Sequence, residues 1–156
     1  IARKDNKLVA AFAMSEEDIT DALSASWVLI GSDSILERPH NNHPRSAGCF
    51  SRFLGTYVRE RKVLTLPDAL SRITILPSRL LEKSCSSMKN RGRIQPGAIA
   101  DITMFDPQEI SDRADVSNPA QESVGIVHVM VNGQLTRKNR KNTDVKSGVP
   151  ILRDTL

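Results

Sequence analysis

The chain of 156 residues carries 22 basic and 18 acidic side chains, giving a formal net charge of +4. Hydrophobic residues make up 39% and charged residues 26%, a globular composition that excludes disordered, collagen-like and disulfide-scaffold classes. The apolar runs of the sequence, Trp27–Ile30 among them, are far too short to span a bilayer, so we expect no membrane partner.

The two cysteines bear on the cellular compartment. Cys49 and Cys85 are too few for a disulfide framework and lack the spacing of metal ligands. They favour reduced thiols in an intracellular protein, and we expect a cytoplasmic location. The sequence opens with Ile1 rather than Met, which we interpret as a fragment without its N-terminal part.

The first predicted elements are a helix, a buried strand and a polar turn. Ser15 precedes three acidic residues and predicts a helix start, and helical apolar spacing continues to about Ser24. The unalternating apolar residues Trp27–Ile30 predict a strand buried on both faces, as in a parallel sheet. The turn Gly31–Ser34 ends that strand. This order is typical of an α/β repeat.

Further helices are predicted after a loop. Residues Glu37–Ala47 are rich in Pro, His and Asn and predict the loop. Apolar residues at helical spacing predict an amphipathic helix over Phe50–Arg61. Thr65 as N-cap with Pro67 in the first turn predicts another helix, and a short helix is expected from about Pro77.

The second half has strand-like patterning. A strand is predicted at Ile99–Phe105, followed by a long polar surface excursion that ends near Ser123. Ile126–Arg137 predicts a β-hairpin, since the central Asn-Gly pair supplies two positive φ angles. The basic run Arg137–Lys141 predicts a solvated edge or tail. With few, scattered aromatic residues, no nucleic-acid partner is expected.

Asp33 is the first candidate for chemistry. A carboxylate just past the C-terminal end of a buried parallel strand occupies the place where α/β barrels put catalytic groups. Alternatively, such an Asp accepts backbone N–H bonds in a strand-to-helix turn. The spacing leaves both interpretations open.

Other polar residues carry less specific signals. His40 and His43 lie three positions apart, but the neighbouring prolines oppose a helix that would converge them on one ion. Arg45 is either a carboxylate clamp or a surface group, and His128 is expected to be a partly buried structural residue. No serine-hydrolase elbow and no phosphate-binding or dinucleotide fingerprint occurs.

A series of segments carries a family resemblance. In chain order they are Gly31–Ser34, His43–Arg45, Phe50–Glu60, Arg91–Ile94, Pro96–Gly97, Ala100–Ile102, Phe105–Pro107 and Val131–Gly133. Together they resemble the C-terminal part of D-aminoacylases, which are N-acyl-D-amino-acid deacylases of the metal-dependent amidohydrolase superfamily. The Gly-x-Ile-x-x-Gly…Ala-Asp stretch is shared across the superfamily. The His-Pro-Arg and Leu-Gly-Thr-Tyr-Val-Arg-Glu segments are more specific to the D-aminoacylase branch.

The resemblance implies an α/β fold: the C-terminal part of a (β/α)₈ amidohydrolase barrel plus late strands of a small β-sandwich domain. Residues 1–83 would form the last barrel strand and the C-terminal helices. Residues 84–156 would form sandwich strands and the basic tail.

The resemblance also implies roles for three residues. Asp33 matches the family's aspartate that acts on a zinc-activated water. It would contact the metal region, take the water's proton and deliver it to the leaving amine. His43 and Arg45 would border the pocket for an N-acyl-D-amino acid and contact the substrate or order the loop.

The family's other metal ligands, a cysteine and histidines, have no counterpart here, and neither Cys49 nor Cys85 replaces them. We therefore expect the C-terminal fragment of a zinc-dependent hydrolase of linear amides, inactive alone and prone to self-association through exposed apolar faces. The alternatives are a fragment of a cyclic amidase of the dihydroorotase or hydantoinase kind, or a non-catalytic interaction module whose basic tail contacts an acidic partner.

Overall fold

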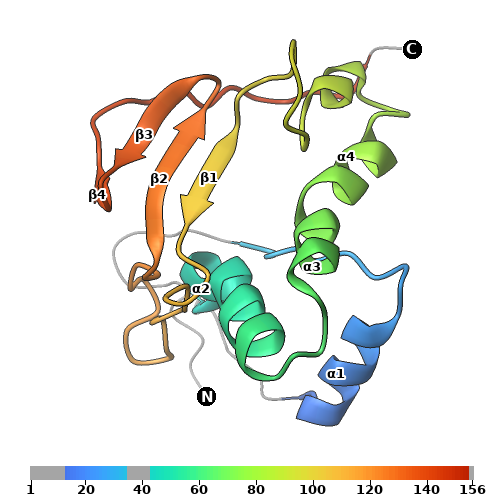
Figure 1. The fold of residues 1–156 in the computed structure, drawn as a ribbon, viewed down its shortest axis with the longest axis vertical. Helices are drawn as coiled ribbons and strands as arrows, with labels where there is room; N and C mark the ends of the chain where they lie inside the picture. Colours follow the sequence, from blue (N-terminus) through green and yellow to red (C-terminus); the bar gives the residue numbers. More distant parts are fainter. Residues whose placement is uncertain (1–12, 35–42, 155–156) are drawn as a thin grey trace, which may run out of the picture.

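The computed structural model describes residues 13–34 and 43–154. Helices built mainly from the first half lie beside a four-stranded antiparallel sheet built from the second half (Figure 1). Within the described residues, no helix is both long and apolar enough to cross a membrane. The mixed helix and sheet content agrees with the predicted α/β class.

The predicted first helix is confirmed as α1, Glu16–Ser24. Ser15 Oγ accepts a hydrogen bond from the Asp18 amide at 3.1 Å, and the Asp18 carboxylate accepts one from the Ser15 amide. These bonds form a capping box. The Ser15 hydroxyl also donates to the Asp18 carboxylate at 2.7 Å, and this bond, together with that from the Ser15 amide, lowers the pKa of Asp18. The local cap signal was therefore sufficient to locate this helix.

The predicted amphipathic helix is also confirmed, although it begins inside the predicted loop. Helix α2 spans Arg45–Arg52, and the π-helix η1 continues it over Phe53–Glu60. The apolar side of η1 lies at the centre of the core. The buried core residues are Leu23, Phe53, Leu54, Tyr57, Val58, Ala69 and Ile110.

Two helices follow in the order predicted. Helix α3 spans Leu66–Ile73, and Thr65 caps it by accepting from the Asp68 amide at 3.3 Å. Helix α4 spans Ile75–Leu81, slightly earlier than expected, and the 3₁₀ turn η2 spans Ser86–Asn90.

The sheet comprises β1 Ile102–Phe105, β2 Ile126–Val131, β3 Gln134–Lys138 and β4 Lys141–Asn142, in that order. All neighbouring pairs are antiparallel. Asn132 and Gly133 have φ values of 48° and 78°, which confirms the predicted hairpin turn.

The basic run Arg137–Lys141 lies at the solvent-exposed edge of the sheet, which is the first of the two predicted alternatives, and does not form a loose tail. Asn139 and Arg140 also have positive φ values, and they form a second tight turn between β3 and β4. Arg137 forms an ion pair with Glu122 at 3.0 Å, and Arg140 forms one with Glu109 at 2.5 Å. These acidic partners are distant in sequence, so the charge run alone could not reveal them.

The buried strand predicted at Trp27–Ile30 does not form among the described residues. This segment lies outside the sheet, and Trp27 is 82% exposed. A strand of a parallel sheet needs neighbouring strands, and the described residues provide none beside this segment. Ile30 nevertheless packs against the core.

The polar stretch after Pro107 is not solely a surface excursion. Ile110 is only 3% exposed and packs in the core beside η1. A Cβ atom on Gly55 would lie 2.5 Å from the Ile110 carbonyl oxygen, so this contact requires glycine. The burial of Ile110 thus packs the polar segment after Pro107 against the helices.

Candidate functional site

Asp33 lies on the turn that follows Trp27–Ile30, with a positive φ of 47°. Few residues other than glycine adopt this conformation, and it often accompanies functional sites. The Asp33 side chain is 79% exposed, and its carboxylate lies 2.6 Å from Arg45 Nη2. Arg45 Nε also donates to the Asp33 carbonyl oxygen at 2.9 Å. The arginine therefore holds both the side chain and the backbone of this turn.

His43 joins the same group through the start of α2. Its Nδ1 accepts a hydrogen bond from the Arg45 amide at 3.1 Å. That bond satisfies an N–H group at the helix N-terminus and leaves Nε2 to carry the proton of the neutral imidazole. The structure thus brings the three predicted site residues, Asp33, His43 and Arg45, together. His40 lies outside the described residues.

A hollow of about 530 Å³ adjoins His43 and Arg45. Its lining comes from α1, α2, η1 and the segment around Asp112. Among the described residues, the lining comprises Ile19, Leu23, Ile30, His43, Pro44, Arg45, Gly48, Cys49, Arg52, Phe53, Tyr57, Asp112, Ala114, Asp115 and Val116. Apolar side chains with a few charged groups are typical of small-molecule sites.

Cys49 in this lining is not activated for nucleophilic chemistry. Burial raises the pKa of its thiol, and the positive charge of Arg45 only partly opposes that shift. Cys49 Sγ lies 3.7 Å from the Gly31 carbonyl oxygen, to which it donates. The thiol is therefore protonated at neutral pH and contacts the chain just before Asp33.

The described residues do not form a zinc site. Over 13–34 and 43–154, no group of three or more His, Cys, Asp or Glu side chains is arranged to hold a metal ion. Cys85 is buried and donates to the Leu152 carbonyl oxygen. Asp33, the one predicted metal contact, instead faces a guanidinium.

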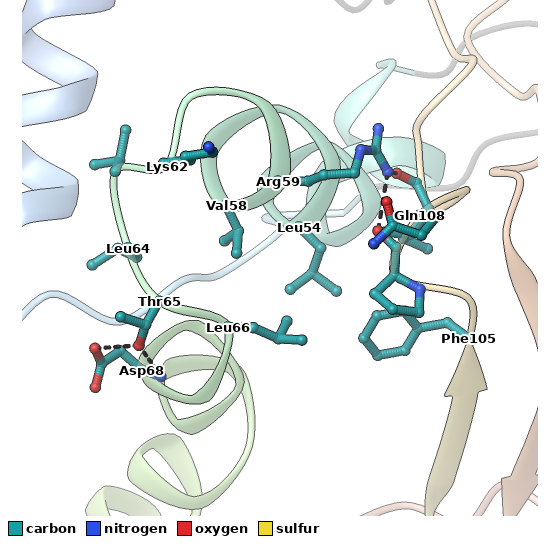
Figure 2. A pocket seen from close by; sticks show the side chains of 13 residues that line it. Leu54, Val58, Arg59, Lys62, Leu64, Thr65, Leu66, Asp68, Phe105 and Gln108 are labelled. Atoms are coloured by element: carbon teal, nitrogen blue, oxygen red, sulfur yellow. Dashed lines mark hydrogen bonds between the residues drawn. The ribbon is translucent and has the colours of Figure 1, made fainter.

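A second hollow, of about 580 Å³, lies between η1, the start of α3 and the end of β1 (Figure 2). Leu54, Leu66 and Phe105 face one another across it (Figure 2). At its edge, Arg59 Nη1 donates to the Ile110 carbonyl oxygen at 2.6 Å. The predicted site residues do not line this hollow, whose lining combines apolar side chains with Arg59, Lys62 and Asp68.

Two polar residues have structural roles. His128 in β2 is half-buried and accepts from the Asn139 amide at 3.2 Å, as expected for a structural histidine. Arg72 in α3 was missed by the sequence analysis, although it is only 6% exposed. An arginine on an amphipathic helix usually faces water, so its residue type gave no signal of burial.

Comparison with known sequences identifies the family. The sequence pattern of the amidohydrolase family matches residues 12–137. The chain belongs to this family. It is 40% identical over 122 residues to an N-acyl-D-glutamate deacylase of Alcaligenes xylosoxydans xylosoxydans, covering 78% of this chain and 24% of the relative. A D-aminoacylase of the same organism is 35% identical over 124 residues, with the same coverages.

Solved structures agree with this assignment. A zinc-containing N-acyl-D-glutamate deacylase from Bordetella bronchiseptica, complexed with a phosphonate inhibitor, superposes with a TM-score of 0.72 at 38% identity. The match covers 83% of this chain and 27% of that one. A D-aminoacylase gives a TM-score of 0.76 at 33% identity, covering 86% and 27%. The chain thus has an amidohydrolase fold and spans about a quarter of these relatives' length.

Proposed function

We propose that this chain is the C-terminal part of a zinc-dependent hydrolase that cleaves the linear amide bond of N-acyl-D-amino acids. Its residues up to about Lys83 would form the last barrel unit and following helices, and the later strands would belong to a β-sandwich. The main observation behind this proposal is that Arg45 binds both the carboxylate and the carbonyl oxygen of Asp33. The D-specific deacylases among the chain's relatives support it and disfavour a cyclic amidase.

In this reaction Asp33 acts as the general base and then the general acid. Its exposed carboxylate projects from a left-handed turn and can accept a proton from the attacking water. It then returns that proton to the departing amine nitrogen. Zinc, when bound, lowers the pKa of water and polarises a carbonyl. Because the described residues do not form its site, most of its ligands would come from the rest of the enzyme.

Arg45 and His43 prepare the adjoining substrate pocket. A guanidinium binds carboxylates with directed, charge-assisted hydrogen bonds, and every N-acyl-amino acid carries a carboxylate. Arg45 already borders the 530 Å³ hollow while it holds Asp33. His43 accepts from the Arg45 amide and so fixes the backbone from which the guanidinium projects.

Exposed apolar side chains, including Trp27 and Ile94, are consistent with a chain that packs against further structure. We propose that this surface contacts the rest of the enzyme, or a second copy of the chain when that part is absent.

A chimera tests the function. In it, this chain replaces the matching segment of the Alcaligenes N-acyl-D-glutamate deacylase. We expect zinc-dependent release of D-amino acids from their N-acetyl derivatives and no turnover of the L-enantiomers. Hydrolysis of dihydroorotate or hydantoin instead would favour a cyclic amidase. A folded chimera without turnover, together with salt-sensitive polyanion binding by the chain, would favour the interaction module.

A further inference from the structure

Arg72 is a buried cation on α3 whose contacts converge on the segment before Asp33. Its Nη1 donates to the carbonyl oxygens of Leu23 and Ala25, each at 2.8 Å, and to that of Val28 at 3.5 Å. Because these acceptors are main-chain carbonyls, the guanidinium recognises the path of the backbone rather than particular side chains.

The main chain of Arg72 adds a second connection. The Ile30 amide donates to the Arg72 carbonyl oxygen at 3.5 Å. Through its side chain and its backbone, Arg72 therefore holds both the C-terminal end of α1 and the segment leading to Gly31 against α3. A cation near the carbonyl end of α1 also has the favourable sign for the helix dipole.

Alternative supports for this segment are sparse. Residues 25–34 contain no ladder strand in the structure, so no sheet register fixes their position. Beyond the contacts of Arg72, Ile30 packs against the core, Cys49 contacts the Gly31 carbonyl oxygen, and Arg45 holds Asp33 itself. Arg72 thus supports the start of the segment while Arg45 supports its end.

We propose that Arg72 is a positioning residue for the reaction. By holding α1 and residues 25–30 against α3, it determines where the Asp33 turn leaves the packed helices. The catalytic part of this inference rests on the proposed function, whereas its structural part does not. Asp33 lies three positions after Ile30, so a small displacement of the segment moves the carboxylate relative to its target.

Hydrogen exchange measured by mass spectrometry on the 156-residue chain tests the structural part. We expect Arg72→Met to increase exchange over residues 25–34 about ten-fold while exchange over 50–60 changes little. Arg72→Lys keeps a cationic donor and should recover much of the protection. Arg79→Met, at an exposed position on α4, is the matched control and should resemble the wild type. Fluorescence of Trp27, the only tryptophan, reports the same segment.

Unchanged exchange over 25–34 in Arg72→Met would overturn the proposal, as would an equal increase throughout the chain. If Arg72→Met does not fold, Arg72→Gln provides the same comparison with a neutral donor. In the chimera we expect Arg72→Met to lower kcat about ten-fold at similar KM, with recovery in Arg72→Lys. Full kcat despite altered exchange would contradict positioning. An inactive parent chimera would count against the proposed function and leave the exchange result standing.

Discussion

The Asp33 turn and the packing around η1 are stabilised in different ways. At the turn, Asp33 and Arg45 form an ion pair whose side chains are 79% and 38% exposed. An exposed pair of this kind contributes only about 0–1 kcal/mol. Around η1, Phe53 and Ile110 are each 3% exposed, and burying such a side chain contributes about 1.5–3 kcal/mol.

The residues that stabilise the fold are therefore different from those proposed to carry out the reaction. The packing around η1 gives the helices and the segment near Ile110 a fixed arrangement. The turn presents a charged group to solvent and is held by polar contacts from Arg45, and Arg72 holds the segment that precedes it. Substitutions in the two regions should therefore affect different measurements.

The largest loss of stability is expected for Phe53→Ala. Removal of this buried ring leaves a cavity and should lower the free energy of unfolding by about 3–5 kcal/mol. Urea denaturation followed by circular dichroism measures the change. A loss below about 1 kcal/mol would mean that η1 does not organise the core.

An intermediate loss is expected for Asp101→Ala. Asp101 forms an ion pair with Arg91, whose side chain is 11% exposed, and accepts from the Asn132 amide at 2.8 Å. Removing the carboxylate leaves a largely buried cation, so we expect the free energy of unfolding to fall by about 2–3 kcal/mol. The same urea titration applies. Asp21→Ala, at an exposed position on α1, is the control and should change stability little.

A smaller loss is expected for Thr65→Ala, because it removes the side-chain cap of α3 while leaving the core intact. Such caps contribute about 1 kcal/mol. Thr65→Ser keeps the hydroxyl and should restore most of the stability in thermal denaturation. Equal melting temperatures for all three proteins would show that the cap does not contribute.

The smallest change in stability is expected for Arg45→Ala, within about 0.5 kcal/mol, because its ion pair is exposed. In the chimera, by contrast, the same change should raise KM for N-acetyl-D-glutamate about ten-fold or more, since a charged hydrogen bond to the substrate is lost. Steady-state kinetics and urea titration on one preparation separate these effects. A large loss of stability together with an unchanged KM would show that Arg45 stabilises the fold and does not bind the substrate.

The sequence-based predictions were accurate where the structural signal lies within a few residues and inaccurate where the structure depends on residues far apart in the chain. Ser15 and Thr65 marked helix starts, and the Asn132–Gly133 pair marked a hairpin, because each signal acts within a few residues. Trp27–Ile30 was assigned to a strand because its apolar run indicates burial but does not identify what covers it. The role of Ile110 was missed because its neighbours are polar.

The site was partly predictable. The sequence predicts Asp33, His43 and Arg45 as site residues. The contact between Arg45 and Asp33, however, joins residues 12 positions apart and leaves no periodic signal in the sequence. The burial of Arg72 depends on carbonyl oxygens more than 40 positions away, so no local pattern predicts it. Long-range polar contacts are therefore the part of the site that the sequence did not predict.

The most direct measurement of the central claim is kcat of the chimera after Asp33→Asn, compared with Asp21→Asn. The neutral amide cannot accept the water's proton, so kcat should fall at least about 100-fold while the free energy of unfolding stays unchanged. Asp21→Asn should retain wild-type kcat. If Asp33→Asn retained full kcat in an active chimera, Asp33 would not be the proton carrier and the proposed role of its turn would be wrong.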